Sequence, residues 1–119
     1  MRYMCFVKHP ENQNQPPQAL MDAMGKHVQK AFKAGTLIDT GGLAPVSAAI
    51  HVRLEGGDIK VKDGPYTEAK EIIGGYAVMK FDTQEEAIQA AKDFMELHRQ
   101  HWPGWEGESE VRQIFGMED

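Results

Sequence analysis

Residues 63–76, with the sequence DGPYTEAKEIIGGY, join a polar turn to an apolar strand near the middle of the chain. Gly64 is restricted to extended geometry because Pro65 follows it, and the proline donates no backbone hydrogen bond. The chain is therefore expected to leave a preceding strand at this point. Asp63 can accept hydrogen bonds from amides one or two residues later, which would hold its carboxylate at the strand end. The Gly74–Gly75 pair lets another backbone or a ligand come close where the next strand starts.

Two of the predicted strands are apolar on both faces. Residues 2–8 and residues 73–81 place apolar side chains on both of the faces that alternate at period two. Helices that cover one side of a sheet require only one apolar face. A second cover is therefore predicted, most simply a partner subunit, which makes the protein a homodimer through the other sheet face.

Two helices are predicted on either side of the chain's middle. Apolar side chains recur at helical spacing over residues 18–34, and Gly35 stands where that helix is expected to end. The segment Thr83-Gln84-Glu85-Glu86 has the pattern of a capping box, in which a hydroxyl and a carboxylate satisfy free amides at a helix start. The second helix is predicted to run from there to about Arg99.

The order of predicted elements indicates the fold class. A second strand begins at Leu37 and is expected to break at Gly41. Residues 50–54 and 59–62 alternate in polarity around a Gly-Gly turn, which predicts a hairpin. With a last strand near the C-terminal end, the order becomes β-α-β-(ββ)-β-α-β, the split βαβ pattern of an α+β protein. A chain of this length is expected to form one domain over residues 1–119.

Composition disfavours several classes of partner. The formal net charge is −5, from 13 Lys and Arg against 18 Asp and Glu, whereas nucleic-acid-binding chains usually carry basic patches. No signal-peptide pattern opens the chain, and no apolar run approaches the roughly 20 residues that span a bilayer. Cys5 is the single cysteine and stands in an apolar strand, so a buried, inert thiol in a reducing compartment is expected. These features predict a cytoplasmic protein that binds neither nucleic acid nor membrane.

The central stretch resembles the DGPF subfamily of the YCII-related proteins, with Tyr66 in place of the usual phenylalanine. Nearly the whole chain shares the resemblance, through counterparts at residues 1–4, 42–45, 68–71, 74–76 and 110–112. The resemblance implies a ferredoxin-like α+β fold, with two helices on one face of an antiparallel sheet and a dimer through the other face, the dimeric α+β barrel. It implies an enzymatic cleft but no established reaction. Similar family members occur beside or fused to extracytoplasmic-function sigma factors, so association with a sigma factor is a further expectation.

Asp63 and His27 are the predicted catalytic residues. A carboxylate fixed at a strand end can orient and polarise a neighbouring imidazole for proton transfer, and the family is expected to use a His–Asp pair. His27 lies on or beside the apolar stripe of the first helix, where a histidine is often only a core-edge residue. The family's histidine falls near Met24 here, so His27 is a substitute one turn later and His9 is another. Asp63 fits equally well as a cap of its own turn.

Other residues are predicted to hold the substrate. Those of the central turn are Gly64, Pro65, Tyr66 and Glu68. A charged residue such as Glu68 also fits an ordinary solvated loop. Trp102 is added because it stands with Trp105 on a Pro-Gly turn, and two indoles are costly to leave in water. They are expected to fold back onto the protein, to line the cleft or to enter the dimer interface.

No metal and no cofactor are predicted. His98 and His101 are three residues apart and would need a third ligand to bind zinc, which no neighbouring cysteine or glutamate supplies. The Gly74–Gly75 pair precedes a strand and not a helix, which is the wrong context for a phosphate-binding loop. His51 falls on the polar face of the predicted hairpin, where a solvated side chain is expected.

The sequence therefore predicts a small cytoplasmic enzyme that acts on a small organic molecule by Asp/His proton transfer. Two alternatives stay open at this point. One is a non-catalytic ligand-binding or sensing module in which Asp63 is structural and the tryptophan loop is a lid. The other is an accessory protein of a sigma-factor-linked regulatory system, which would act through a partner because the chain has no helix-turn-helix signature.

Overall fold

The computed structural model describes residues 1–10, 15–63 and 72–116, and of Asp63 it describes the backbone. Its elements in chain order are β1 (Arg2–His9), α1 (Gln18–Ala34), β2 (Leu37–Gly42), the 3₁₀ turn η1 (Val46–Ala48), β3 (Ile50–Glu55), β4 (Asp58–Asp63), β5 (Ile72–Lys80), α2 (Gln84–His101) and β6 (Glu108–Ile114). The predicted order of strands and helices is confirmed.

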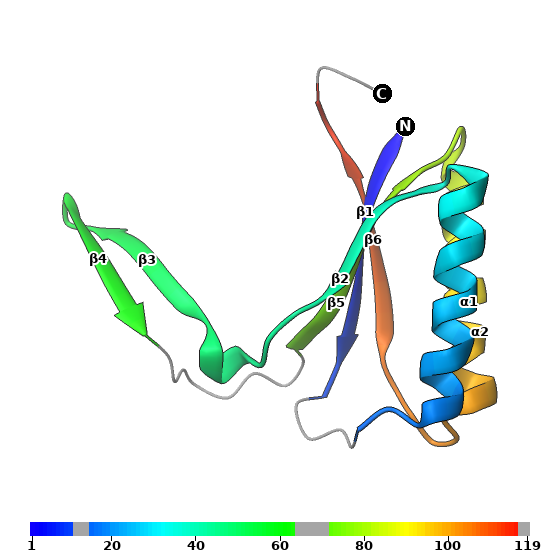
Figure 1. Ribbon diagram of the computed structural model, residues 1–119. Coiled ribbons are helices and arrows are strands. Elements are labelled where there is room, and N and C mark those ends of the chain that lie inside the picture. Colours follow the sequence, from blue (N-terminus) through cyan, green and yellow to red (C-terminus); the bar gives the residue numbers. More distant parts are fainter. Residues whose placement is uncertain (11–14, 64–71, 117–119) are drawn as a thin grey trace.

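Four strands form one sheet in the order β2-β5-β1-β6, and every neighbouring pair is antiparallel. Both helices lie on one side of this sheet (Figure 1). The arrangement is α+β and is consistent with a ferredoxin-like fold, in which the two βαβ halves interlock. The two central strands are β1 and β5, which are the strands that the sequence shows to be apolar on both faces.

Local signals fix both helices. Gly35 ends α1 in the left-handed conformation at φ 78°, and its amide donates to carbonyls of the last turn. At the start of α2, the Glu86 amide donates to the Thr83 hydroxyl oxygen at 3.2 Å, which is the predicted cap. Ala87, in the first turn, is fully buried against Tyr3 and Cys5 of β1. The cap at Thr83 and the burial of Ala87 therefore place the start of α2 over β1.

The second strand differs from its prediction. β2 continues through Gly41 to Gly42, where a break was expected. It can do so because glycine at these positions lets neighbouring groups approach: a Cβ on Gly41 would lie 3.1 Å from the Tyr76 ring. A Cβ on Gly75 would likewise lie 3.1 Å from the Gly41 carbonyl oxygen. The close approach of another backbone predicted at Gly74–Gly75 is thus confirmed at Gly75.

The sheet face opposite the helices carries apolar side chains from both central strands. Met4 pairs with Val78 and Phe6 with Tyr76, and all four are half-buried. Within the described residues, neither helix lies over this face (Figure 1). Dimerisation through it stays a prediction. No helix among the described residues is both long and apolar enough to span a membrane.

The hairpin β3–β4 forms a separate two-stranded sheet. Gly56 and Gly57 adopt φ values of 57° and 85° at its tip, as a tight hairpin turn requires. Figure 1 shows it projecting away from the four-stranded sheet, on the side opposite the helices. The hairpin was predicted, but its separation from the rest of the molecule was not.

Candidate functional site

A cavity of about 710 Å³ lies between the two helices and the four-stranded sheet. Its wall is mostly apolar, with Leu20 and Met24 from α1, Cys5 and Val7 from β1, and Phe94 from α2. Pockets that bind small molecules typically measure about 300–1,000 Å³ and are lined mainly by apolar side chains. The cavity therefore has the size and lining of a small-molecule site.

The cavity exists because the sheet presents small side chains to the helices at this point. Gly75 and Ala77 of β5 pair with Val7 and Cys5, so they share the face that the helices cover. Ser109 of β6 pairs with Val7 from the other side and lines the same space. A larger residue at any of these positions would extend toward the helices and reduce the volume.

Among the described residues, His98 is the one polar or charged residue that is buried, with 5% of its surface exposed. It lines the cavity from the last turn of α2. Its Nδ1–H donates to the Phe94 carbonyl oxygen at 2.9 Å, because a carbonyl can only accept. The proton therefore resides on Nδ1 in the neutral ring, and Nε2 carries the lone pair.

Burial lowers the pKa of His98 from its ordinary value, and the hydrogen bond to Phe94 opposes that change without reversing it. The cause is desolvation, which disfavours the imidazolium form in this apolar environment. The ring is therefore neutral at pH 7. A neutral imidazole with a fixed tautomer is a proton acceptor at one defined atom, Nε2.

Aromatic rings hold His98 on two sides. The Trp105 ring lies 4.4 Å from the imidazole between centroids, and Phe94 meets it edge-on at 5.0 Å. Trp102 in turn packs near Trp105 with centroids 6.1 Å apart. Both tryptophans line the cavity, so they fold back onto the protein, one of the three outcomes expected for them.

Glycines allow the tryptophan loop to take this path. Gly104 has φ 83°, a left-handed conformation that reverses the chain after α2. A Cβ on Gly107 would overlap the Trp105 ring and would lie 2.7 Å from the Lys8 carbonyl oxygen. The loop therefore packs tightly between α2 and β1, and Trp105 reaches His98 from there.

His27, a predicted catalytic residue, lines the cavity from α1. Its ring is half-buried, and its centroid lies 5.9 Å from that of Phe94. Phe94 thus contacts both His27 and His98, from opposite helices. The structure brings His27 and Trp102 into the wall of one cavity, together with His98.

His9, the alternative histidine, lines the cavity from the end of β1. Its Nδ1–H donates to the Pro10 carbonyl oxygen at 2.8 Å, which again leaves the lone pair on Nε2. The ring lies over Gly74, where a Cβ would be 2.5 Å from His9 Nε2. β1 and β5 change register here, so Gly74 is the residue that makes room for this imidazole.

The other predicted site residues lie outside the part of the chain whose side chains are described. Asp63 is the last residue of β4, and its backbone pairs with Ile50. Gly64, Pro65, Tyr66 and Glu68 follow it in the undescribed segment. The predicted contact of Asp63 with a histidine therefore stays a prediction.

Cys5 matches its predicted state. The thiol is free and buried, and burial raises its pKa. It is therefore protonated at neutral pH and is not a nucleophile, although it lines the cavity.

His98 was missed as a cavity residue, although the sequence holds a signal for it. Ala87, Ala91, Phe94 and His98 recur at intervals of four, three and four residues, which marks one face of a helix. His98 thus continues the buried stripe of α2.

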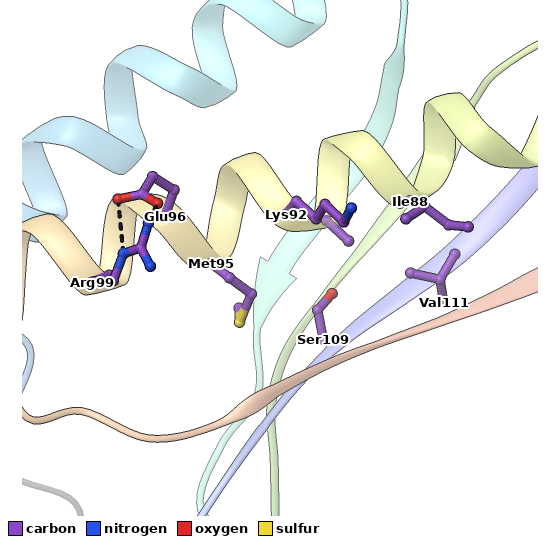
Figure 2. Close-up of a pocket in the computed structure, with 8 residues that line it drawn as sticks. Ile88, Lys92, Met95, Glu96, Arg99, Ser109 and Val111 are labelled. Carbon is purple, nitrogen blue, oxygen red and sulfur yellow. Dashed lines mark hydrogen bonds and ion pairs between the residues drawn. The ribbon is translucent and has the colours of Figure 1, made fainter.

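A second depression, of about 630 Å³, lies on the outer side of α2 beside the edge strand β6. Figure 2 shows its residues: Ile88, Lys92, Met95, Glu96 and Arg99 on the helix and Ser109 and Val111 on the strand. Arg99 forms an exposed ion pair with Glu96, one turn earlier on the same helix. Because its charged groups are exposed and it contains no buried titratable side chain, it is a weaker candidate than the inner cavity.

The fold and the cavity define a class: an α+β protein with a mostly apolar pocket between two helices and an antiparallel sheet. The YCII-related domain matches residues 1–98, so the chain belongs to the YCII-related family. It is also 34% identical over 65 residues to an uncharacterised protein of Rhizobium meliloti (strain 1021). That match covers 55% of this chain and 52% of the relative, about half the length of each. Trp102 and Trp105 lie beyond the residues that the family matches.

Proposed function

We propose that this protein is an enzyme of the DGPF subfamily that binds a small, mostly apolar organic molecule in the inner cavity and moves a proton on it. The observation that carries the proposal is the state of His98. Its tautomer is set by the Phe94 carbonyl, its pKa is lowered by burial, and it lines the cavity. A general base needs this combination of a free lone pair, a fixed position and a neutral resting form.

The proposed step is abstraction of a proton from an acidic C–H group of the bound molecule. The C–H electron pair stays on the substrate as an enolate, and the proton forms a bond to His98 Nε2, giving an imidazolium. Return of a proton from that imidazolium, or from another acid, completes an isomerisation or an exchange. The apolar surroundings that lower the His98 pKa also favour prompt return of the proton.

His9 and His27 are proposed as the second proton-carrying groups of this site. His9 Nε2 carries the lone pair in the tautomer that the Pro10 carbonyl selects. His27 lines the same cavity from α1. Asp63 is proposed, as in the sequence prediction, to orient one of these imidazoles. A carboxylate beside an imidazole can accept a hydrogen bond from one ring nitrogen and so fix which nitrogen faces the substrate.

The test uses two simple probes, benzyl methyl ketone and phenylpyruvate, each with an acidic proton next to a carbonyl group. Each is incubated with the protein in D2O, and loss of the α-proton signal is followed by proton NMR. We expect exchange faster than in buffer, with a loss of at least about tenfold in His98→Asn. Asparagine places its amide where Nδ1 was, so it can keep the bond to the Phe94 carbonyl while it removes Nε2.

His101→Asn is the matched control, because the same change three residues later in α2 leaves His98 intact. Exchange that persists in His98→Asn would contradict the assignment of the base. A wild-type protein that binds a probe without any exchange would support the sensing module instead. Absence of binding by both probes, seen as unchanged tryptophan fluorescence, would contradict an aromatic carbonyl ligand.

A further inference from the structure

The hairpin formed by β3 and β4, residues 50–63 and here called the arm, has one face made of aliphatic side chains. Val52 pairs with Val61 and Leu54 with Ile59 across the two strands. With Ile50, they make up five large apolar residues, and each is 66–75% exposed. The opposite face is polar, because Arg53 pairs there with Lys60. The arm therefore has the amphipathic pattern of a hairpin that covers something.

Within the described residues, nothing covers the apolar face. Neither strand of the arm joins the four-stranded sheet, and Figure 1 shows the arm standing apart from it. The Cα radius of gyration is 16.4 Å, against about 13.5 Å for a compact domain of this length. An isolated two-stranded hairpin is only marginally stable in water, so this one requires a packing partner.

We propose that the apolar face of the arm packs on a second copy of this chain in a symmetric, arm-exchanged dimer. The proposal adds to the homodimer predicted from the sequence and does not depend on the function of the cavity. The arm lies on the side of the sheet opposite the helices (Figure 1), the side of the half-buried pairs Met4–Val78 and Phe6–Tyr76. A two-fold pairing of these faces brings each arm against the partner subunit.

The surface areas agree with this occupant. A Val, Leu or Ile side chain offers about 100 Å² of apolar surface, so the exposed parts of the five residues amount to roughly 350 Å² per arm. Two arms and the equal surfaces they cover would bury on the order of 1,400 Å², within the range of about 1,200–2,000 Å² that is typical of stable interfaces. One arm on an unrelated protein would bury half of that. The two-fold arrangement therefore buries more apolar surface than a complex with one unrelated protein would.

The test compares two double variants by sedimentation velocity across a dilution series of the purified protein. Val52→Ser with Val61→Ser removes a directly paired set from the apolar face. Arg53→Ser with Lys60→Ser makes the same replacement at the adjacent pair on the polar face. We expect the wild type to be a dimer, the first variant to raise its dissociation constant at least ~100-fold, and the second to change it less than ~10-fold.

Three results would overturn the proposal. They are a wild type that is monomeric at every concentration, a dimer that both variants weaken equally, and a dimer that neither weakens. A dimer that neither variant weakens would still be compatible with dimerisation through the sheet, but it would exclude the arm from the interface. A monomeric wild type would mean that the apolar face of the arm packs on a partner other than a second copy of this chain.

Hydrogen exchange of the wild type tests the proposal without any substitution, so its result does not depend on whether a variant folds. The amides of residues 50–63 are expected to exchange slowly above the dissociation constant and fast below it, while the central strand β1 is protected at both concentrations. Equal exchange of the arm at both concentrations would contradict the proposal without any substitution.

Discussion

The Nδ1–H of His98 donates to the carbonyl oxygen of Phe94, one turn earlier in α2, at 2.9 Å. This contact decides which nitrogen of the imidazole holds the proton, and burial decides that the ring is neutral. The Phe94 ring meets the same imidazole edge-on, with 5.0 Å between centroids. One residue thus supplies both the backbone acceptor and a wall of the environment in which His98 titrates.

The first prediction concerns stability against pH. The pKa of His98 is lower in the folded than in the unfolded protein, so between the two values the unfolded state binds more protons. Stability should therefore rise with pH through this window and level off above about pH 6.5, the ordinary histidine value. Urea unfolding at pH 7.5 and pH 5.0 should show that the wild type loses more unfolding free energy at the lower pH than His98→Asn does. Equal losses would show that His98 is not a buried neutral group.

A second prediction uses fluorescence. An imidazolium quenches a neighbouring indole, and the Trp105 ring lies 4.4 Å from His98 between centroids. Emission from the two tryptophans of the chain should fall as the pH is lowered, with a midpoint below 6.5, while the far-ultraviolet circular dichroism is unchanged. The transition should vanish in His98→Asn and persist in His101→Asn.

The third prediction concerns the tryptophan loop. Gly107→Ala places a methyl group against the Trp105 ring and the Lys8 carbonyl oxygen, and a backbone atom in β1 cannot move aside easily. We expect a loss of about 1–3 kcal/mol in the free energy of unfolding and a red shift of the emission. Urea unfolding followed by tryptophan fluorescence measures both the loss of stability and the shift of the emission. An unchanged protein would mean that the loop does not pack between α2 and β1.

Gly74→Ala should behave differently, because its new methyl group meets the end of the His9 side chain and no backbone atom. The imidazole can rotate away, so the stability should change by less than about 1 kcal/mol. The ring resonances of His9 should shift in NMR spectra while those of His98 stay in place. A large loss of stability would instead indicate that the His9 ring is locked in position.

A fifth prediction fills the cavity. Ala77 faces the helices from β5, and leucine at this position would extend into the space. Ala77→Leu should reduce binding of benzyl methyl ketone at least about tenfold while the stability changes by less than about 1.5 kcal/mol. Ala19→Leu, on an exposed position of α1, is the matched control. Binding that survives in Ala77→Leu would place the probe elsewhere.

Elements set by local chemistry were predictable from the sequence. Gly35 ends α1 because it takes a left-handed conformation, and Thr83 starts α2 by accepting a hydrogen bond from an amide three residues later. Both signals act within a single turn. The alternation of polar and apolar residues around Gly56 and Gly57 likewise predicted the hairpin from its own sequence.

Features that depend on distant contacts were not predictable in the same way. His98 continues the apolar stripe of α2, but its contact with Trp105 depends on the turn at Gly104, which spacing along α2 alone does not indicate. The exposure of Val52 depends on how the arm leaves the sheet, and the sequence pattern would be the same for an arm folded back on it. Asp63 was identified from its place in the chain, and position along a chain does not give distance across a fold.

The role of His98 is tested most directly by a long-range ¹H–¹⁵N NMR titration of its ring in the wild-type protein. We expect the tautomer with the proton on Nδ1 at pH 7, a pKa below 6.5, and a change at Nε2 on addition of benzyl methyl ketone. A proton on Nε2 at pH 7, or a pKa at or above the ordinary value, would contradict the role of His98 as the proton acceptor of the cavity.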